Sequence, residues 1–352
     1  MWDFLPVNLN EIKQVEVIRG PASAVWGANA VNGVVNVITK SPREMQGTSA
    51  VLGFGTFDRE VGDNSLDAGS LWYVSGTHAQ AINEQWAFKL SGGGYVQDAL
   101  PRPGGLIPGS PGTGTPYPSF ENTGTTQPKF DTRFDYDGAN GRRVSLSGGV
   151  AGTEGIMHSG IGPFDIETGS WMGYAKANMT QGGFRAAFFT NILDGDAINL
   201  LTRTPTNQPT TFAFATKTFD FEASNVQTVA QRHVVNYGGN LRFNRFDLEL
   251  APEGDDRTEF GLYVQDEIFL NDYFRLTLGG RVDRFDYLDD FVFSPRAAIM
   301  LKPQADHTFR LSYNRAYRAP SVVNNFLDVT IAEPINLGLF HPAFAGQIYP
   351  LP

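Results

Sequence analysis

The chain has 352 residues and a net charge of −10, which disfavours a nucleic-acid partner because no basic stripe is available to neutralise phosphates. The absence of cysteine excludes disulfides and thiolate metal sites, and the sequence has no apolar run long enough for a helix to span a bilayer. Charged residues make up 18% and aromatic residues 12% of the sequence, with 39 glycines. A transmembrane β-barrel has such a composition because each strand is apolar on one face only, although a large soluble β-sandwich or solenoid would share it.

The first residues do not resemble a secretory signal. Met1–Phe4 has no basic region, no apolar core and no small-residue cleavage site. Because an outer-membrane protein needs such a signal, a barrel interpretation leads us to expect that the chain starts inside its gene.

The stretch Val15–Lys40 contains two short β-rich runs with turn-forming residues between them. Gly20-Pro21 ends the first run. Ala22–Trp26 can then close one helical turn, and Val34–Thr39 is a second run in which Asn36 is the one amide.

This stretch resembles the last part of the plug domain of TonB-dependent outer-membrane receptors. The family pattern runs through one register, and the chain matches it at Glu16, Arg19, Gly20, Pro21, Ser23, Gly27, Ala30, Gly33, Val34, Asn36, Ile38, Thr39 and Lys40. So many matches in one register make this signal far more specific than a lone glycine motif.

The resemblance implies that plug charges meet opposite charges on the inner wall of a barrel. We therefore predict plug–barrel contacts for Glu16 and Arg19, supported by the motif residues Gly20, Pro21, Gly27, Gly33 and Asn36. The candidate partners on the wall are Arg242, Arg275, Arg281, Asp283 and Arg310. The alternative is that Glu16 and Arg19 are ordinary solvated charges.

After Ser41-Pro42, apolar residues alternate with polar or small residues in segments of about ten, the length of a tilted membrane strand. In Phe274–Asp283, for example, the apolar side chains lie on one face and Arg275, Arg281 and Asp283 on the other. The alternation predicts strands, but a soluble sandwich would show it as well.

Short and long links between these segments take turns along the chain, as in outer-membrane barrels with tight periplasmic turns and long outer loops. The tight links are expected near Asn83-Glu84, Ala139–Gly141, Gln181-Gly182, Gln231-Arg232, Asn271-Asp272 and Gln304–Asp306, and the long ones over Asp58–Gly69, Asp98–Gln127, Glu154–Gly169 and Asp194–Lys217. This spacing predicts about thirteen strands between Thr48 and Ala319, with one uncertain boundary around Phe219–Thr228.

A second resemblance to the same receptors covers Glu259–Ser321. Its motifs are Phe260–Glu267, Gly280–Asp283, Phe293–Arg296 and Tyr317–Ser321. Barrels of this family have about 22 strands around a plugged lumen. We therefore expect an all-β fold: the C-terminal part of a plug domain in residues 1–42 and the N-terminal part of a transmembrane antiparallel β-barrel in residues 43–352, without the first half of the plug, the energy-coupling box and the last strands.

The segment Asp98–Gln127 is rich in proline and glycine, and it is either a flexible linker or a ligand-facing outer loop. In the second case Tyr117 and Phe120 would be apolar contacts for the ligand. The five histidines show no metal-ligand spacing, and His158, in an expected outer loop, is the best of them for ligand contact. We expect no metal site, no cofactor and no enzyme, since no catalytic arrangement of side chains stands out.

The resemblance implies energised uptake of a scarce nutrient, such as a ferric siderophore or cobalamin, across the outer membrane of a Gram-negative bacterium. The expected partners are the inner-membrane TonB complex, acting through the missing N-terminal box, outer-membrane lipid and a small chelate. The alternatives are a passive pore or adhesin built on a barrel, and a soluble secreted β protein.

Overall fold

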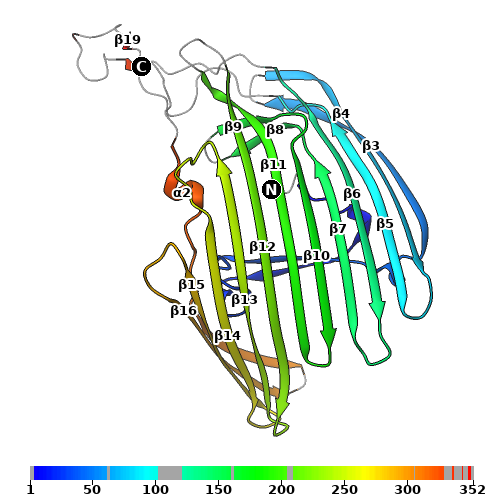
Figure 1. The fold of residues 1–352 in the computed structure, drawn as a ribbon, viewed down its shortest axis with the longest axis vertical. Coiled ribbons are helices and arrows are strands. Elements are labelled where there is room, and N and C mark those ends of the chain that lie inside the picture. The colour runs from blue at the N-terminus through cyan, green and yellow to red at the C-terminus, as the bar shows by residue number, and fades with distance from the viewer. Residues whose placement is uncertain are drawn as a thin grey trace.

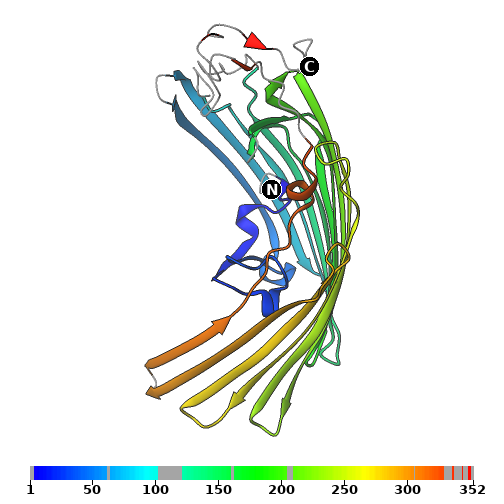
Figure 2. The same ribbon diagram turned by 90° about the vertical axis from the view of Figure 1, so that its left-hand side faces the viewer.

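The computed structural model describes residues 4–61, 64–101, 121–159, 162–203, 209–304, 306–328, 335–336, 343 and 348–349. A small N-terminal unit lies on the concave side of one large curved sheet (Figure 2). No helix within these ranges is long and apolar enough to cross a membrane.

The N-terminal unit, here called the plug segment (residues 4–44), is built on one antiparallel pair of strands. β1 (Ile12–Arg19) pairs with β2 (Gly33–Thr39), and the expected helical turn between them is α1 (Ser23–Trp26). Short 3-10 turns, η2 (Leu9–Glu11) and η3 (Pro42–Glu44), precede and follow the pair. The expected division at residues 42 and 43 falls within η3 and stays a prediction.

The large sheet contains fifteen strands, of which all but β8 and β9 follow one another as hydrogen-bonded neighbours (Figure 1). The neighbouring strands are β3 (Gly47–Val61), β4 (Asn64–Ala81), β5 (Trp86–Gln97), β6 (Thr125–Asp137), β7 (Arg143–Gly152), β10 (Trp171–Gln181), β11 (Phe184–Arg203), β12 (Pro209–Val229), β13 (His233–Leu248), β14 (Arg257–Phe269), β15 (Phe274–Phe285), β16 (Val292–Gln304) and β17 (His307–Asn314). They match the expected strand number, and β12 crosses the uncertain boundary without a break. In the described part of the chain β3 and β17 are the two free edges, so the sheet is a partial, open barrel.

The remaining elements lie at the upper end of the sheet in Figure 1. β8 (Gly155–Ser159) and β9 (Gly162–Ile166) form a hairpin, and β9 also pairs with β11. The short helix α2 (Val322–Phe326) follows β17, and the two-residue strands β18 (Ile335–Asn336) and β19 (Ile348–Tyr349) pair with each other.

The predicted tight links are confirmed, but two of the predicted long links are wrong. β3 and β4 stay paired as far as Val61 and Asn64, and β11 and β12 stay paired as far as Arg203 and Pro209. The ends of β3, β4 and β11 carry polar residues on both faces and so lack the alternation of the strand centres. Backbone hydrogen bonds to the neighbouring strand hold them extended nevertheless. The predicted long link Glu154–Gly169 does connect two strands of the wall, but it contains the β8–β9 hairpin where only a loop was expected.

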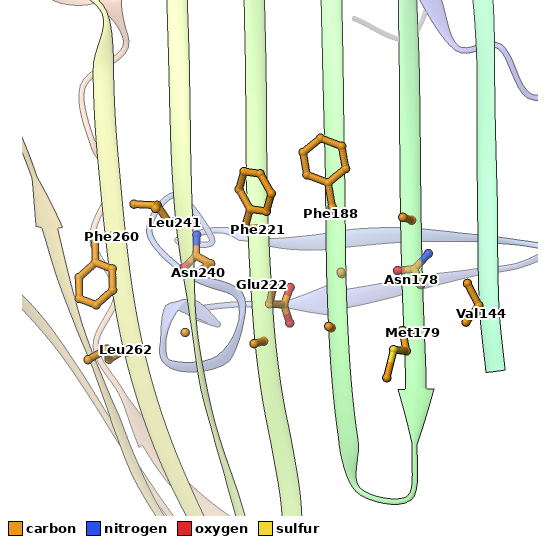
Figure 3. Close-up of a pocket in the computed structure, with 15 residues that line it drawn as sticks. Val144, Asn178, Met179, Phe188, Phe221, Glu222, Asn240, Leu241, Phe260 and Leu262 are labelled. Carbon is orange, nitrogen blue, oxygen red and sulfur yellow. The ribbon is translucent and has the colours of Figure 1, made fainter. Parts of the chain in front are cut away.

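The alternation of side chains separates the two faces of the sheet as predicted. Large apolar side chains such as Phe221, Phe260 and Leu262 are exposed on the convex face, and Figure 3 shows them there, with Glu222 and Asn240 turned toward the plug segment. A transmembrane barrel presents such an apolar surface to lipid and keeps its polar side chains inside.

The convex face generates a prediction for Leu262, which is 53% exposed on β14. Leu262→Arg should destabilise the membrane-inserted protein by about 2–4 kcal/mol if the position lies near the bilayer centre, because lipid cannot solvate the guanidinium. Urea unfolding in lipid vesicles measures this, with Leu262→Met as the matched control. Equal stabilities of the two variants would contradict the assignment of this face to lipid.

Candidate functional site

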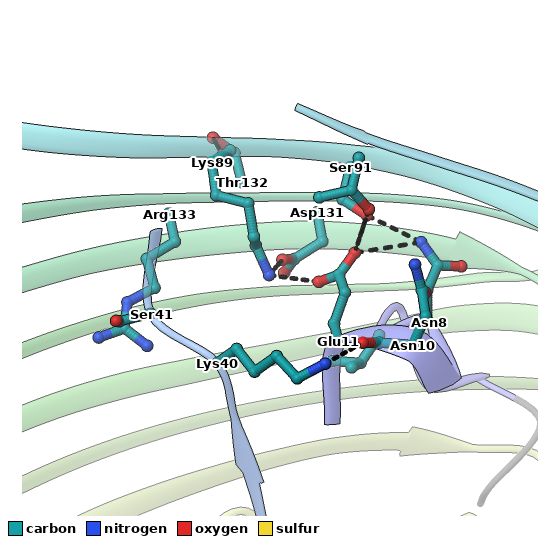
Figure 4. Close-up of polar contacts among 12 residues, drawn as sticks. Asn8, Asn10, Glu11, Lys40, Ser41, Lys89, Ser91, Asp131, Thr132 and Arg133 are labelled. Atoms are coloured by element: carbon teal, nitrogen blue, oxygen red, sulfur yellow. Dashed lines mark hydrogen bonds and ion pairs between the residues drawn. The ribbon is translucent and has the colours of Figure 1, made fainter. Parts of the chain in front are cut away.

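The strongest contact between the plug segment and the wall surrounds Glu11, at the end of η2. Its side chain is 0% exposed, and its carboxylate accepts hydrogen bonds from Thr77 Oγ1 (3.0 Å), Ser91 Oγ and Asn8 Nδ2 (3.3 Å). It also forms an ion pair with Lys89 Nζ (Figure 4). Every strong partner except Asn8 comes from β4 or β5, so this carboxylate fixes the start of the plug segment to the wall.

Lys89 connects this carboxylate to a second one further along the wall. Its ammonium lies 3.0 Å from Asp131 Oδ1 on β6, and its side chain is 1% exposed. Tyr174 on β10 donates a hydrogen bond to the other oxygen of Asp131. The network therefore runs from the plug segment across strands β5, β6 and β10, with one lysine between two carboxylates.

The Glu11 carboxyl remains charged inside this network. Burial by itself would raise its pKa, but hydrogen bonds from Lys89 and Ser91, together with the charge of Lys89, hold the pKa below its ordinary value. A buried charge with several donors and one counter-ion is stable in place, whereas the same charge without its partner is strongly unfavourable.

The second contact lies at the end of the plug segment, where η3 leads into β3. Arg43 pairs with Asp137 Oδ2 (3.0 Å) and donates hydrogen bonds to the carbonyl oxygens of Asn83 (3.1 Å) and Glu84 (2.7 Å). The plug segment is therefore attached here to the tight turn between β4 and β5 and to the end of β6.

Glu44 stabilises the same corner from within the plug segment. It accepts hydrogen bonds from Lys13 Nζ and from the backbone N–H of Ser41 (2.8 Å). The hydrogen bond from Lys13 and those from Ser41 lower the pKa of Glu44 to about 2. Because Lys13 and Glu44 are both largely exposed, solvent screens this pair and its contribution to stability is small.

The third contact joins the loop after α1 to the segment that follows β17. The N–H of Asn29 donates to the carbonyl oxygen of Tyr317 (2.9 Å), and its side-chain oxygen accepts from the N–H of Ala319 (2.9 Å).

Arg281, which is 6% exposed, lies between two glycines. Its guanidinium is 3.4 Å from where a Cβ of Gly27 would be, and it would overlap a Cβ on Gly261.

The structure explains other motif residues within the plug segment itself. Gly33 has φ +145° and a Cβ there would overlap the carbonyl oxygen of Ile18, so only glycine fits. Asn36 lies opposite Glu16 in the β1–β2 pair and donates a hydrogen bond to its carboxylate (3.0 Å). Glu16 and Arg19 are exposed and, among the described residues, neither forms an ion pair with the wall; their contact with a barrel stays a prediction.

The wall charges proposed as their partners mostly pair with other residues of the wall. Arg281 binds Asp283 (2.7 Å) and Arg242 binds Asp220 (2.7 Å). Arg275 lies 3.6 Å from Glu267. Sequence reasoning instead missed the Glu11 network, although a signal existed: Lys89 is the only charged residue of β5 and falls on its inner face.

The structure does not test the residues proposed for ligand contact. Tyr117 and Phe120 lie outside the described residues, and His158 lies in β8, a strand where a loop was expected. In the part of the chain that the structure describes, no group of three or more acidic or histidine side chains is arranged to hold a metal ion.

A cavity of about 670 Å³ separates the loop around α1 from the wall. Trp26 and Asn36 line it from the plug segment. From the wall it is lined by both signs of charge, namely Lys176, Arg185, Arg242, Arg281, Asp220, Glu222, Glu259 and Asp283. The space between plug segment and wall is thus polar and charged.

Two family models match the chain. The model described as "TonB dependent receptor-like, beta-barrel" matches residues 109–351, which is more than half of the sequence. The model described as "TonB-dependent Receptor Plug Domain" matches residues 2–34. The vitamin B12 transporters BtuB of Vibrio cholerae and Vibrio vulnificus are 36% identical over 56 residues and 42% identical over 55 residues, in each case 16% of this chain and 9% of the relative.

Solved structures with the same fold include several receptors. A mutant of the ferric enterobactin receptor PfeA of Pseudomonas aeruginosa superposes with a TM-score of 0.68 at 15% identity, covering 90% of this chain and 50% of the receptor. The siderophore receptor PirA of the same organism gives 0.66 at 17% identity, with 90% and 51% covered. The chain thus spans about half the length of these structures, and at such identities the likeness concerns the fold alone.

The Glu11 network generates a prediction for Lys89. Lys89→Met should destabilise the docked plug segment by about 3–5 kcal/mol, because two buried carboxylates lose the ammonium between them. Trypsin cleavage at Lys13 or Arg19 as a function of urea measures the release of the segment. Lys176→Met is the matched control, since Lys176 also lies on the concave face but, among the described residues, forms no hydrogen bond or ion pair with the plug segment. Equal urea midpoints for the two variants would refute the role of Lys89.

The low pKa of Glu44 generates a prediction for pH. Folding lowers the pKa of the Glu44 carboxyl from 4.5 to about 2. Such a group stabilises the folded state fully above pH 4.5, and this stabilisation is lost as the pH falls toward 2. The stability difference between the wild type and Glu44→Gln should therefore be constant above pH 5 and shrink below it, with a size of about 0–1 kcal/mol. Urea midpoints across pH 2–7 measure it, and Lys13→Gln should reduce the effect. A difference that is independent of pH would contradict the assignment.

Proposed function

Because the chain belongs to the TonB-dependent receptor family, we propose that it acts within a receptor for energised nutrient uptake across the outer membrane of a Gram-negative bacterium. In this proposal the plug segment closes the lumen and outer loops capture the cargo. A force transmitted by the inner-membrane TonB complex then rearranges the plug segment so that the cargo passes.

One observation carries this proposal: the plug segment is held on the concave face by few contacts of unequal strength. The half-exposed pair Arg43–Asp137 contributes about 0–1 kcal/mol. The buried pair Glu11–Lys89 is much harder to separate. A segment attached in this way stays in place at rest and needs applied work for release, which is what an energy-coupling partner supplies.

We propose a small chelate as the cargo. The related proteins named above are described as siderophore receptors and vitamin B12 transporters, which supports a ferric siderophore or a cobalamin-like chelate for this chain. The motif residues Glu16, Arg19, Gly20, Pro21, Gly27, Gly33 and Asn36 are proposed for plug function, and Tyr117, Phe120 and His158 for ligand contact.

The two other functions that the sequence allows are less well supported. A passive pore has no use for a segment fixed inside its lumen by a buried ion pair. A soluble protein would leave aromatic and aliphatic side chains such as Phe54, Trp72 and Leu311 exposed to water on the convex face, a costly arrangement.

The test of this proposal is uptake in cells that express the protein from its complete gene. Uptake of its iron-labelled or cobalt-labelled cargo should fall to the background of passive diffusion when the inner-membrane energy complex is deleted, while binding at the cell surface stays unchanged. The matched control is a strain with the complex restored. Uptake that is equal in both strains would exclude the energised mechanism, and a large, permanently open conductance in planar bilayers would favour a pore.

A further inference from the structure

A second cavity, here called the apolar pocket, lies on the concave face above the plug segment. It has a volume of about 570 Å³. Leu193 on β11 and Phe212 and Phe214 on β12 form its wall, and the β8–β9 hairpin and α2 border it. This is the end of the sheet where the hairpin and the longer links lie, opposite the tight turns (Figures 1 and 2).

The chemistry of this pocket differs from the rest of the inner wall. Its described lining contains no charged side chain, and only Thr216 and Asn324 carry polar side-chain groups. The cavity beside α1, lower on the same face, is lined by four cationic and four anionic side chains. Because barrel interiors are normally polar, an uncharged pocket at the upper end of the lumen needs its own explanation.

The pocket is a preformed site rather than a fully packed core. Phe4 from the plug segment is 1% exposed and packs with Phe164 and Leu193 at its base, so the base is closed. Phe212 and Phe214 are only partly buried against this cluster, and Leu327 at the end of α2 is exposed. The volume falls in the range of small-molecule sites, which are mostly apolar and about 300–1,000 Å³ in size.

We propose that the apolar pocket binds an uncharged aromatic group of the imported chelate, so that the cargo is an aryl-bearing chelate rather than a purely hydrophilic one. The inference rests on the proposed uptake function and adds the substrate class. The absence of a cation in the lining disfavours an anionic metal-binding head at this position, since no side chain could compensate its charge. The edge-to-face pair Phe164–Phe212, with ring centroids 6.3 Å apart, belongs to an aromatic lining against which another ring packs favourably.

The test compares two ferric tris-hydroxamates with the same iron-binding head, one with a benzoyl cap and one with an acetyl cap. Binding of each radio-iron complex is measured at 0 °C on whole cells that lack the energy complex and express the protein from its complete gene. We expect the benzoyl compound to bind at least about tenfold more tightly, because only its ring fills the pocket.

Three variants locate the effect. Phe212→Ala should remove the benzoyl preference, and so should Leu327→Ser, which changes an exposed side chain and leaves the buried core intact. Phe189→Ala is the matched control, because this phenylalanine lies on the neighbouring strand under Arg242 (5.7 Å from its ring centroid) and outside the pocket; it should keep the preference. Resistance of each variant to trypsin on whole cells verifies that the variant is folded.

Equal binding of the two chelates, or binding of neither, would overturn the inference. Loss of the preference in Phe189→Ala alone would also overturn it. A fatty acid or lipopolysaccharide that co-purifies with the wild type but not with Phe212→Ala would make a lipid the occupant instead. Uptake that depends on the energy complex without any benzoyl preference would leave the proposed function intact and refute only this substrate class.

Discussion

The ion pair between Glu11 and Lys89 is the interaction on which the arrangement of this protein depends. It joins a carboxylate of the plug segment to an ammonium of the wall, away from solvent on both sides. Two charges in such a place are tolerated only when each has its partner and its remaining hydrogen bonds. The Glu11 carboxylate accepts further hydrogen bonds from Asn8, Thr77 and Ser91. The Lys89 ammonium has Asp131 as its second anionic partner. The plug segment therefore has one position at which it fits the wall.

Away from this network the plug segment is held more lightly. The corner at η3 relies on exposed or half-exposed charges, and the loop after α1 on two hydrogen bonds involving Asn29. Most charges of the inner wall nearby pair with one another, as Arg281 does with Asp283 and Arg242 with Asp220. A wall that satisfies its own charges would keep its stability during the plug movement that the proposed function requires.

The polarity of the concave face changes along the barrel axis. Near α1 the wall carries charges of both signs around a cavity, whereas the upper end, near Phe212 and α2, is lined by uncharged side chains. Under the proposed uptake function, a cargo entering from the loop side would meet apolar contacts first and charged ones later. In the proposed uptake, such an order would favour capture by burial of apolar surface.

The sequence by itself determined the strands, their tight turns and the face on which each charge lies, because a side-chain period of two and turn-forming residues are local properties. It also identified the plug motif, in which Gly33 is required by its own backbone. Only the tertiary structure decided that Glu11 meets Lys89, since the two are 78 positions apart and their pairing depends on how the plug segment is seated in the curved sheet. The extension of β3, β4, β11 and β12 was likewise decided by hydrogen bonds between strands, which no local pattern encodes.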